Sequence, residues 1–287
     1  MMLSIYGAFF AASFVLIIVS AIIGYYEARR LTSNNAEATL ENIHKYARYL
    51  YPLAGLSVLV MIIVSVIITV PSLLIKTPLW FDLYAVPGLY PTLSALFSFL
   101  LTLAYFVARL TGHAQKNQLL TAAVLIIAIM PYVQNQYTRP IYSNLTDIKN
   151  TDGVYLQSDG SSCAAASGAN IARVLGISKT EKEIATLMGT TKLGTSFGQS
   201  VYGMNKLGVK CNRIDLKDVD IMLVKPPAML SVDHEVLGKE THAVAFLGFK
   251  NNRAEVLDPL IGRVFFSIKD LNKIWHGNGL ECAIDKK

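Results

Sequence analysis

In Gln157-Ser-Asp-Gly-Ser-Ser-Cys163-Ala-Ala-Ala-Ser-Gly-Ala-Asn170, a polar loop ends at a cysteine that small residues follow. Ile171, Val174 and Leu175 continue the run with apolar residues at helical spacing, which predicts a helix with Cys163 in its first turn. The unpaired N–H groups at a helix N-terminus favour a thiolate, and a cysteine in such a place can have its pKa lowered from about 8.5 toward roughly 3.5–7.5. The side-chain amide of Gln157, six residues upstream, could stabilise an oxyanion at the same point.

A cysteine nucleophile needs a base, and five histidines are available. His44 and His113 lie between apolar segments, whereas His242 opens a predicted strand over residues 242–249. A second predicted strand, 254–257, ends at Asp258, and two antiparallel strands joined by the turn 250–253 would bring Asp258 beside His242. This is the arrangement of a Cys–His–Asp triad. The alternative is a buried structural thiol and a solvated histidine that never meet.

Together these spacings resemble the bacteriocin-processing endopeptidases, cysteine peptidase family thirty-nine of the papain-like group. The resemblance covers about residues 148–284 and includes Leu193-Gly-Thr-Ser196 and the segment from Phe266 to Gly277. It departs from the family at Ser162, where members commonly carry Asp or Asn before the nucleophile. The resemblance implies four roles, which fall on Gln157 (oxyanion donor), Cys163 (nucleophile), His242 (base) and Asp258 (orienting group). We expect no cofactor and no metal at this site.

The first half of the chain has the composition of a membrane anchor. Of the 287 residues, 53% are hydrophobic and only 16% are charged, which is too apolar for an ordinary soluble domain. Four apolar segments, at residues 3–26, 52–75, 89–108 and 119–133, predict an all-α transmembrane region of about four helices within residues 1–134. The fourth is short and contains Pro131, so an interfacial or half-crossing helix is its alternative.

Basic residues in the short loops predict the orientation of this anchor. The first and third loops carry the most lysine and arginine, namely Arg29, Arg30, Lys45 and Arg48 in the first and Arg109 and Lys116 in the third. Such loops favour the cytoplasm. With four spans, the C-terminal domain then lies outside the cytoplasm, and we expect the protein in a bacterial inner (plasma) membrane.

The second half reads as an α+β domain over residues 150–287, joined to the anchor by a polar tether, 135–149. Capping signals predict helices after Thr180 and after Ser196, and short strands follow near 209–214, 228–232, 242–249, 254–257 and 263–268. A helix over 269–275 and a strand over 280–284 complete the order, which is also the papain-like plan that the resemblance implies. Cys211 and Cys282 each lie in a predicted strand, either as a disulfide or as two buried thiols.

The preferred function is a membrane-anchored cysteine endopeptidase that cleaves a peptide or protein substrate, with cleavage after Gly-Gly suggested by the resemblance. The alternatives are a catalytically silent peptide-binding module tethered to the membrane, and a cytoplasmic leader peptidase that serves a separate exporter. The lipid bilayer is an expected partner, and a secretion system is a further candidate. The sequence lacks a lysine and arginine cluster for nucleic-acid binding, and it lacks the phosphate-binding loop of an ATPase.

Overall fold

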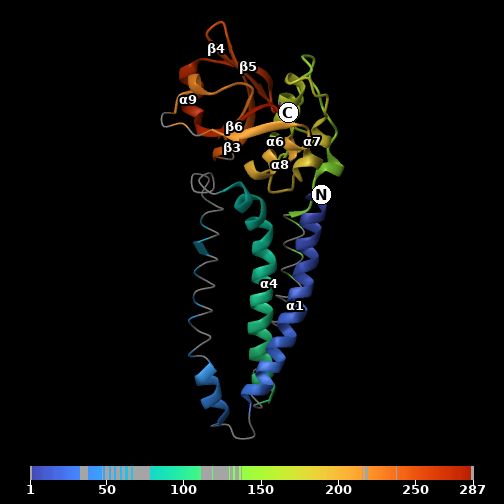
Figure 1. Ribbon diagram of the computed structural model, residues 1–287, viewed down its shortest axis with the longest axis vertical. Helices are drawn as coiled ribbons and strands as arrows, with labels where there is room; N and C mark the ends of the chain where they lie inside the picture. The colour runs from blue at the N-terminus through green and yellow to red at the C-terminus, as the bar shows by residue number, and fades with distance from the viewer. Residues whose placement is uncertain are drawn as a thin grey trace. The chain divides into compact units, whose positions relative to one another are not determined.

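The computed structural model describes residues 2–32, 38–46, 78–110 and 138–285, apart from 215, 217, 218 and 237, together with single positions in 48–66 and 118–136. The chain divides into two compact units, which are treated separately below. One consists mainly of Thr138–Lys287, and the other of Ser4–Leu74 with Tyr84–Tyr137. Figure 1 labels most of their helices and strands.

The unit formed by Ser4–Leu74 and Tyr84–Tyr137 contains most of two long apolar helices, α1 (Met2–Leu31) and α4 (Leu79–Leu110). Their segments Ala11–Leu31 and Thr92–Arg109 are long and apolar enough to cross a membrane. Only 22% and 17% of these segments are buried, so most of their apolar surface faces outward, as lipid-exposed helices require. The predicted spans 3–26 and 89–108 overlap these helices, while 52–75 and 119–133 fall largely outside the described residues.

The two helices pack closely at a polar and a small residue. The buried Ser98 hydroxyl donates to the Ile17 carbonyl at 2.9 Å, which satisfies a polar group on an otherwise apolar surface. A Cβ atom at Gly24 would come within 2.9 Å of the Phe99 carbonyl oxygen, so only glycine permits this approach. Small residues and interhelical hydrogen bonds are the usual means of helix association in a bilayer.

The unit that consists mainly of Thr138–Lys287 is an α+β domain (Figure 1). Its six-stranded antiparallel sheet has the order β1-β6-β2-β3-β4-β5. Its helices are α6 (Cys163–Val174), α7 (Glu181–Met188), α8 (Phe197–Asn205) and α9 (Ile268–Ile274), with short 3-10 turns η1 (Tyr142–Asn144) and η2 (Ile221–Leu223). The strands are β1 (Val209–Arg213), β2 (Ala228–His234), β3 (Gly238–Lys250), β4 (Arg253–Asp258), β5 (Gly262–Phe266) and β6 (Trp275–Ile284). The α+β content expected from the sequence is confirmed.

Local sequence signals account for the helix ends. A capping box opens α7, where the Thr180 hydroxyl accepts from the Glu183 N–H and the Glu183 carboxylate accepts from the Thr180 N–H. Ser196 and Gln199 form the same reciprocal pair at the start of α8. Each box satisfies two backbone donors that the helix leaves unpaired. The helix starts predicted at both positions are confirmed.

Two strands begin at least four residues earlier than the sequence indicates. Strand β3 begins at Gly238 rather than at residue 242, and β6 begins at Trp275 rather than at residue 280. The additional part of β6 contains Gly277 and Gly279, which weaken a strand signal, but Trp275 lies opposite Val232 of β2 after a register shift. Pairing with a neighbouring strand therefore overrides the weak local preference.

The sheet separates two apolar clusters. Neighbouring residues on one strand enter different clusters, as Met229 and Leu230 of β2 do. One cluster lies under α6, α7 and α8, and the other lies under α9 with Trp275 at its centre. Ile141 and Leu145, from the segment predicted as a tether, are buried in the cluster under α6–α8. This polar-looking segment therefore contributes to the core of the domain.

A disulfide closes one side of the sheet. Cys211 of β1 and Cys282 of β6 are direct partners across the antiparallel pair, and their sulfur atoms are bonded. The two cysteines are 71 residues apart in the sequence. The link therefore restricts a long loop in the unfolded chain, which is the source of its expected stabilisation.

Replacing both Cys211 and Cys282 with alanine is expected to lower the free energy of unfolding by about 2–4 kcal/mol, because the long unfolded loop regains its freedom. The fluorescence of the fully buried Trp275 can report urea unfolding of the detergent-solubilised full chain in a Trp80→Phe background. A reducing agent should destabilise the parent protein by a similar amount and leave the double variant unaffected. Equal stability of the parent and the double variant under oxidising conditions would contradict this expectation.

Candidate active site

Cys163 is the first residue of α6, as predicted, and is the free cysteine of the domain. The Ser162 side chain, at the N-cap, makes no hydrogen bond to the helix. Its hydroxyl donates instead to the Asp159 carbonyl at 2.8 Å. The first N–H groups of α6 are therefore not capped by Ser162 and can interact with a negative charge beside Cys163.

Small buried residues let α6 pack directly on the sheet. Ala164, Ala165 and Ala166 are at most 5% exposed, and the Ser167 hydroxyl donates to the Ala243 carbonyl of β3 at 2.9 Å. Ala243 directly follows His242. The helix that carries the thiol and the strand that carries the imidazole are thus joined one residue away from the imidazole.

The predicted pairing of His242 with Asp258 is present in the structure. His242 Nε2 lies 2.8 Å from Asp258 Oδ1, and both side chains are largely buried, at 6% and 14% exposed. Asp258 Oδ1 also accepts the Leu260 N–H at 2.8 Å, which fixes the carboxylate. The bond from Ser167 to Ala243 described above places α6, which carries Cys163, beside the strand of this imidazole. Since Nε2 is occupied by Asp258, Nδ1 is the nitrogen left for the sulfur.

The environment of His242 favours the protonated ring. Burial lowers its pKa, but the hydrogen bonds with Asp258 and with Cys163, together with the attraction of both groups for a positive charge, raise it. The raising effects win, and the pKa of His242 increases from 6.5 to about 9. An imidazolium held between a thiol and a carboxylate is the charge arrangement of an activated cysteine.

Gln157 lies in the loop before α6, the helix that begins with Cys163. Its backbone N–H donates to the Pro259 carbonyl at 2.8 Å, so it is attached to the residue that follows Asp258. Its Nε2 donates to the Asp159 carbonyl at 3.2 Å, while its Oε1 is buried without a partner. An amide NH₂ has two hydrogens, so one remains for another acceptor.

The structure adds a side chain that the sequence did not single out. The ring of His234, on β2, makes an edge-to-face contact with the His242 ring, with centroids 5.6 Å apart and an interplanar angle of 69°. Val232 of β2 lies opposite His242 of β3, which places His234 near it. This contact depends on the pairing of β2 with β3. The pattern of apolar and polar residues around His234 gives no indication that the two rings meet.

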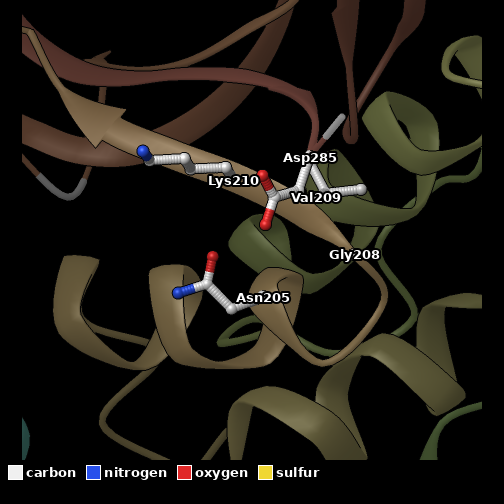
Figure 2. Close-up of a pocket in the computed structure, with 5 residues that line it drawn as sticks. All are labelled: Asn205, Gly208, Val209, Lys210 and Asp285. Carbon is white, nitrogen blue, oxygen red and sulfur yellow. The ribbon is translucent and has the colours of Figure 1, made fainter. Parts of the chain in front are cut away.

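Among the described residues, no group of three or more His, Cys, Asp or Glu side chains could hold a metal ion. A separate pocket lies where the turn after α8 meets β1 and the end of β6 (Figure 2). Its lining residues are Asn205, Gly208, Val209, Lys210 and Asp285, none of which belongs to the predicted site.

Comparison with known proteins places a similarity on this domain. The model of the peptidase C39 family matches residues 152–287, which include all four predicted site residues. An uncharacterized protein of Methanothermobacter thermautotrophicus is 30% identical over 132 residues, which cover 44% of this chain and 85% of that protein. An uncharacterized protein of Methanothermobacter marburgensis is 29% identical over 129 residues, covering 43% of this chain and 83% of that protein.

Two solved structures are also similar. One is a double glycine motif protease from an AMS/PCAT transporter in complex with the leader peptide, with a TM-score of 0.40, 16% identity, and coverage of 48% of this chain and 90% of that chain. The other is the peptidase domain of Streptococcus ComA, with a TM-score of 0.39, 24% identity, and coverage of 45% of this chain and 95% of that chain.

The geometry predicts how Cys163 reacts with iodoacetamide. Because the pKa of His242 is raised to about 9, the imidazolium that favours the thiolate should persist through neutral pH. The alkylation rate of Cys163 should therefore rise less steeply with pH in the parent than in His242→Ala, which has no positive charge at this position to favour the thiolate.

Asp258→Asn removes one cause of the raised pKa of His242, so less imidazolium persists at neutral pH and the rate should rise more steeply with pH than in the parent. Mass spectrometry of the alkylated peptide measures the rate at Cys163, since Cys211 and Cys282 are joined in a disulfide. A parent protein whose rate rises as steeply as that of His242→Ala would contradict the pairing.

Proposed function

Since the chain belongs to the peptidase C39 family, we propose that it is a membrane-anchored cysteine endopeptidase. One observation carries the proposal: the helix that begins with the Cys163 thiol is bonded through Ser167 to the strand of His242, whose Nε2 is 2.8 Å from the buried Asp258 carboxylate. A nucleophile, a base and an orienting group in this order are the parts that acyl transfer needs. A peptide-binding module without activity would not require a buried carboxylate bonded to the imidazole beside a cysteine-bearing helix.

In the first step the Cys163 thiolate forms a bond to the carbonyl carbon of the scissile peptide, and the carbonyl oxygen becomes an oxyanion. The free hydrogen of the Gln157 amide and the N–H groups that begin α6 are the donors assigned to that oxygen. The imidazolium of His242 then gives its Nδ1 proton to the leaving nitrogen as the C–N bond breaks. The products of this half reaction are an amine and a thioester on Cys163.

In the second half reaction the neutral His242 removes a proton from water, and the hydroxide oxygen attacks the thioester carbon. Collapse of the second oxyanion breaks the C–S bond and releases a carboxylic acid, and the enzyme returns to its thiolate–imidazolium state. Asp258 holds the ring through Nε2 in both halves and stabilises its positive charge. Its second contact, with the Leu260 N–H, keeps the carboxylate in place during these proton transfers.

The substrate class that fits the family is a peptide with Gly-Gly before the scissile bond. The solved relatives described above include a double glycine motif protease, which supports testing this motif first. The scissile carbonyl of a Gly-Gly segment belongs to a residue without a side chain, and it can therefore come close to a sulfur at the start of a helix. The substrate is thus proposed to be a precursor with a leader that ends in Gly-Gly.

We place the peptidase domain outside the cytoplasm. The proposal keeps the four spans predicted from the sequence, two of which are described helices that could span a membrane, with Arg29 and Arg30 after the first span favouring the cytoplasmic side. The disulfide between Cys211 and Cys282 supports an oxidising compartment for the domain, because structural disulfides are rare in the cytosol. A substrate would then reach the enzyme after its translocation, which makes a secretion system the natural supplier.

Cys163→Ala should abolish cleavage of a fluorogenic peptide that has Gly-Gly directly before the scissile bond, and it should leave the protein folded. Cys211→Ala/Cys282→Ala is the matched control, because it removes thiols that have no part in the reaction. This control should keep its turnover at a temperature where it remains folded. Residual turnover in Cys163→Ala at the parent level would remove the enzyme assignment.

A phosphatase reporter that is active only outside the cytoplasm should be active when fused after Lys287 in a bacterial host. A fusion that ends after Thr32, in the first loop, should be inactive, because that loop is expected inside. Activity of each fusion, normalised to its amount, measures the orientation. The reverse pattern, with a cytoplasmic reporter active after Lys287, would return the domain to the cytoplasm.

A further inference from the structure

The segment that carries Gln157 is held at every backbone N–H from residue 155 to residue 158. The N–H of Leu156 donates to the Ile148 carbonyl at 2.9 Å, and that of Gln157 donates to the Pro259 carbonyl at 2.8 Å. The other two donors, at the ends of the segment, bind buried side chains instead of backbone. Those two side chains are Asn170 and Glu181.

Asn170 ties the beginning of this segment to the helix of the nucleophile. Its Oδ1 accepts the Tyr155 N–H and its Nδ2 donates to the Tyr155 carbonyl, both at 2.9 Å. Asn170 is fully buried and lies on α6, seven residues after Cys163. Seven residues are about two helical turns, so the clamp lies on the same side of the helix as the thiol.

Glu181 holds the other end of the segment. Its Oε1 accepts the Ser158 N–H at 3.0 Å and its Oε2 accepts the Ser158 hydroxyl at 2.7 Å. The Glu181 side chain is fully buried, and burial of a carboxylate is costly unless such bonds compensate. Both of its bonds go to the residue that directly follows Gln157.

The position of Glu181 at the start of α7 does not explain this burial. The helix is already capped by Thr180 and Glu183, and Glu183 is exposed to solvent. The Ser158 hydroxyl also accepts the Thr146 N–H at 3.1 Å, so its own proton is directed to Glu181. The buried carboxylate thus serves Ser158 and not the helix end.

We propose that Glu181 is a positioning residue that holds the Gln157 amide at the place where the oxyanion forms. The inference rests on the proposed peptidase function and extends it to a residue that does not touch the reacting atoms. Donors for an oxyanion act only when they are fixed in advance at the correct distance. A carboxylate that binds both polar groups of Ser158 fixes the neighbouring residue, Gln157, whose amide uses one hydrogen for the Asp159 carbonyl and keeps the other for an oxyanion.

The test is Glu181→Gln in the full-length protein, measured with the fluorogenic Gly-Gly peptide. Glutamine keeps the shape but offers one acceptor oxygen in place of two, so one contact to Ser158 is lost. We expect kcat to fall roughly 10- to 100-fold, as for a small misplacement of a catalytic group, with KM within about twofold of the parent value. Glu183→Gln is the matched control on the same helix, because glutamine also completes a capping box, and it should keep its kcat.

A double-mutant cycle with Gln157→Ala separates positioning from general damage. Gln157→Ala alone should lower kcat by about 10²–10³, and Glu181→Gln should then add less than about a twofold loss in that background. The rate of Cys163 alkylation should be the same in all these variants, since it requires no oxyanion donor. If Glu181→Gln does not fold, Ser158→Ala, which removes one of the two contacts, takes its place in the same cycle.

The inference is overturned if Glu181→Gln lowers kcat equally with and without Gln157, or if it leaves kcat unchanged in the parent. These results differ from a failure of the proposed function, which would show as the absence of any cleavage that depends on Cys163. A Gln157→Ala protein with the kcat of the parent would remove the oxyanion donor itself and the inference with it.

Discussion

The antiparallel pairing of β3 with β4 is the constraint on which the rest of the site depends. The strands turn at Asn251 and Asn252, both with positive φ, and asparagine tolerates this conformation better than most residues. The pairing brings His242 of β3 beside Asp258, the last residue of β4. A slip of one residue would move each side chain to the other face of the sheet and separate the two.

The same end of β4 also organises the parts that arrive from the helical side of the domain. Pro259, directly after Asp258, accepts the N–H of Gln157, so the loop before α6 is attached to the end of the hairpin. The helix itself is joined to β3 next to His242 through Ser167. The thiol, imidazole, carboxylate and amide therefore come from four separate segments. The segments of the amide and the thiol are bonded to the hairpin of β3 and β4, which carries the other two groups, so a displacement of this hairpin would disturb all four together.

Much of this arrangement could be predicted from local signals in the sequence, and the remainder could not. The capping boxes at Thr180 and Ser196 and the asparagine turn depend on residues only a few positions apart, which is why they are visible in the sequence. The contact of His234 with His242, the burial of Glu181 and the early start of β6 each depend on partners far away in the chain. Periodicity and propensity carry no information about such partners.

The distribution of buried polar groups shows where the domain is built for rigidity. Asn170 and Glu181 are fully buried and direct their polar atoms at the segment beside Gln157, although apolar residues there would avoid the desolvation of a carboxylate. On the far side of the sheet, the short strand β1 is an edge paired only with β6, and there a covalent disulfide secures it. Hydrogen bonds fix direction as well as distance, whereas a disulfide mainly limits separation. The site needs the Gln157 amide to point in one direction, and hydrogen bonds can set that direction. The edge strand β1 needs only to stay attached to β6, and the disulfide provides that attachment.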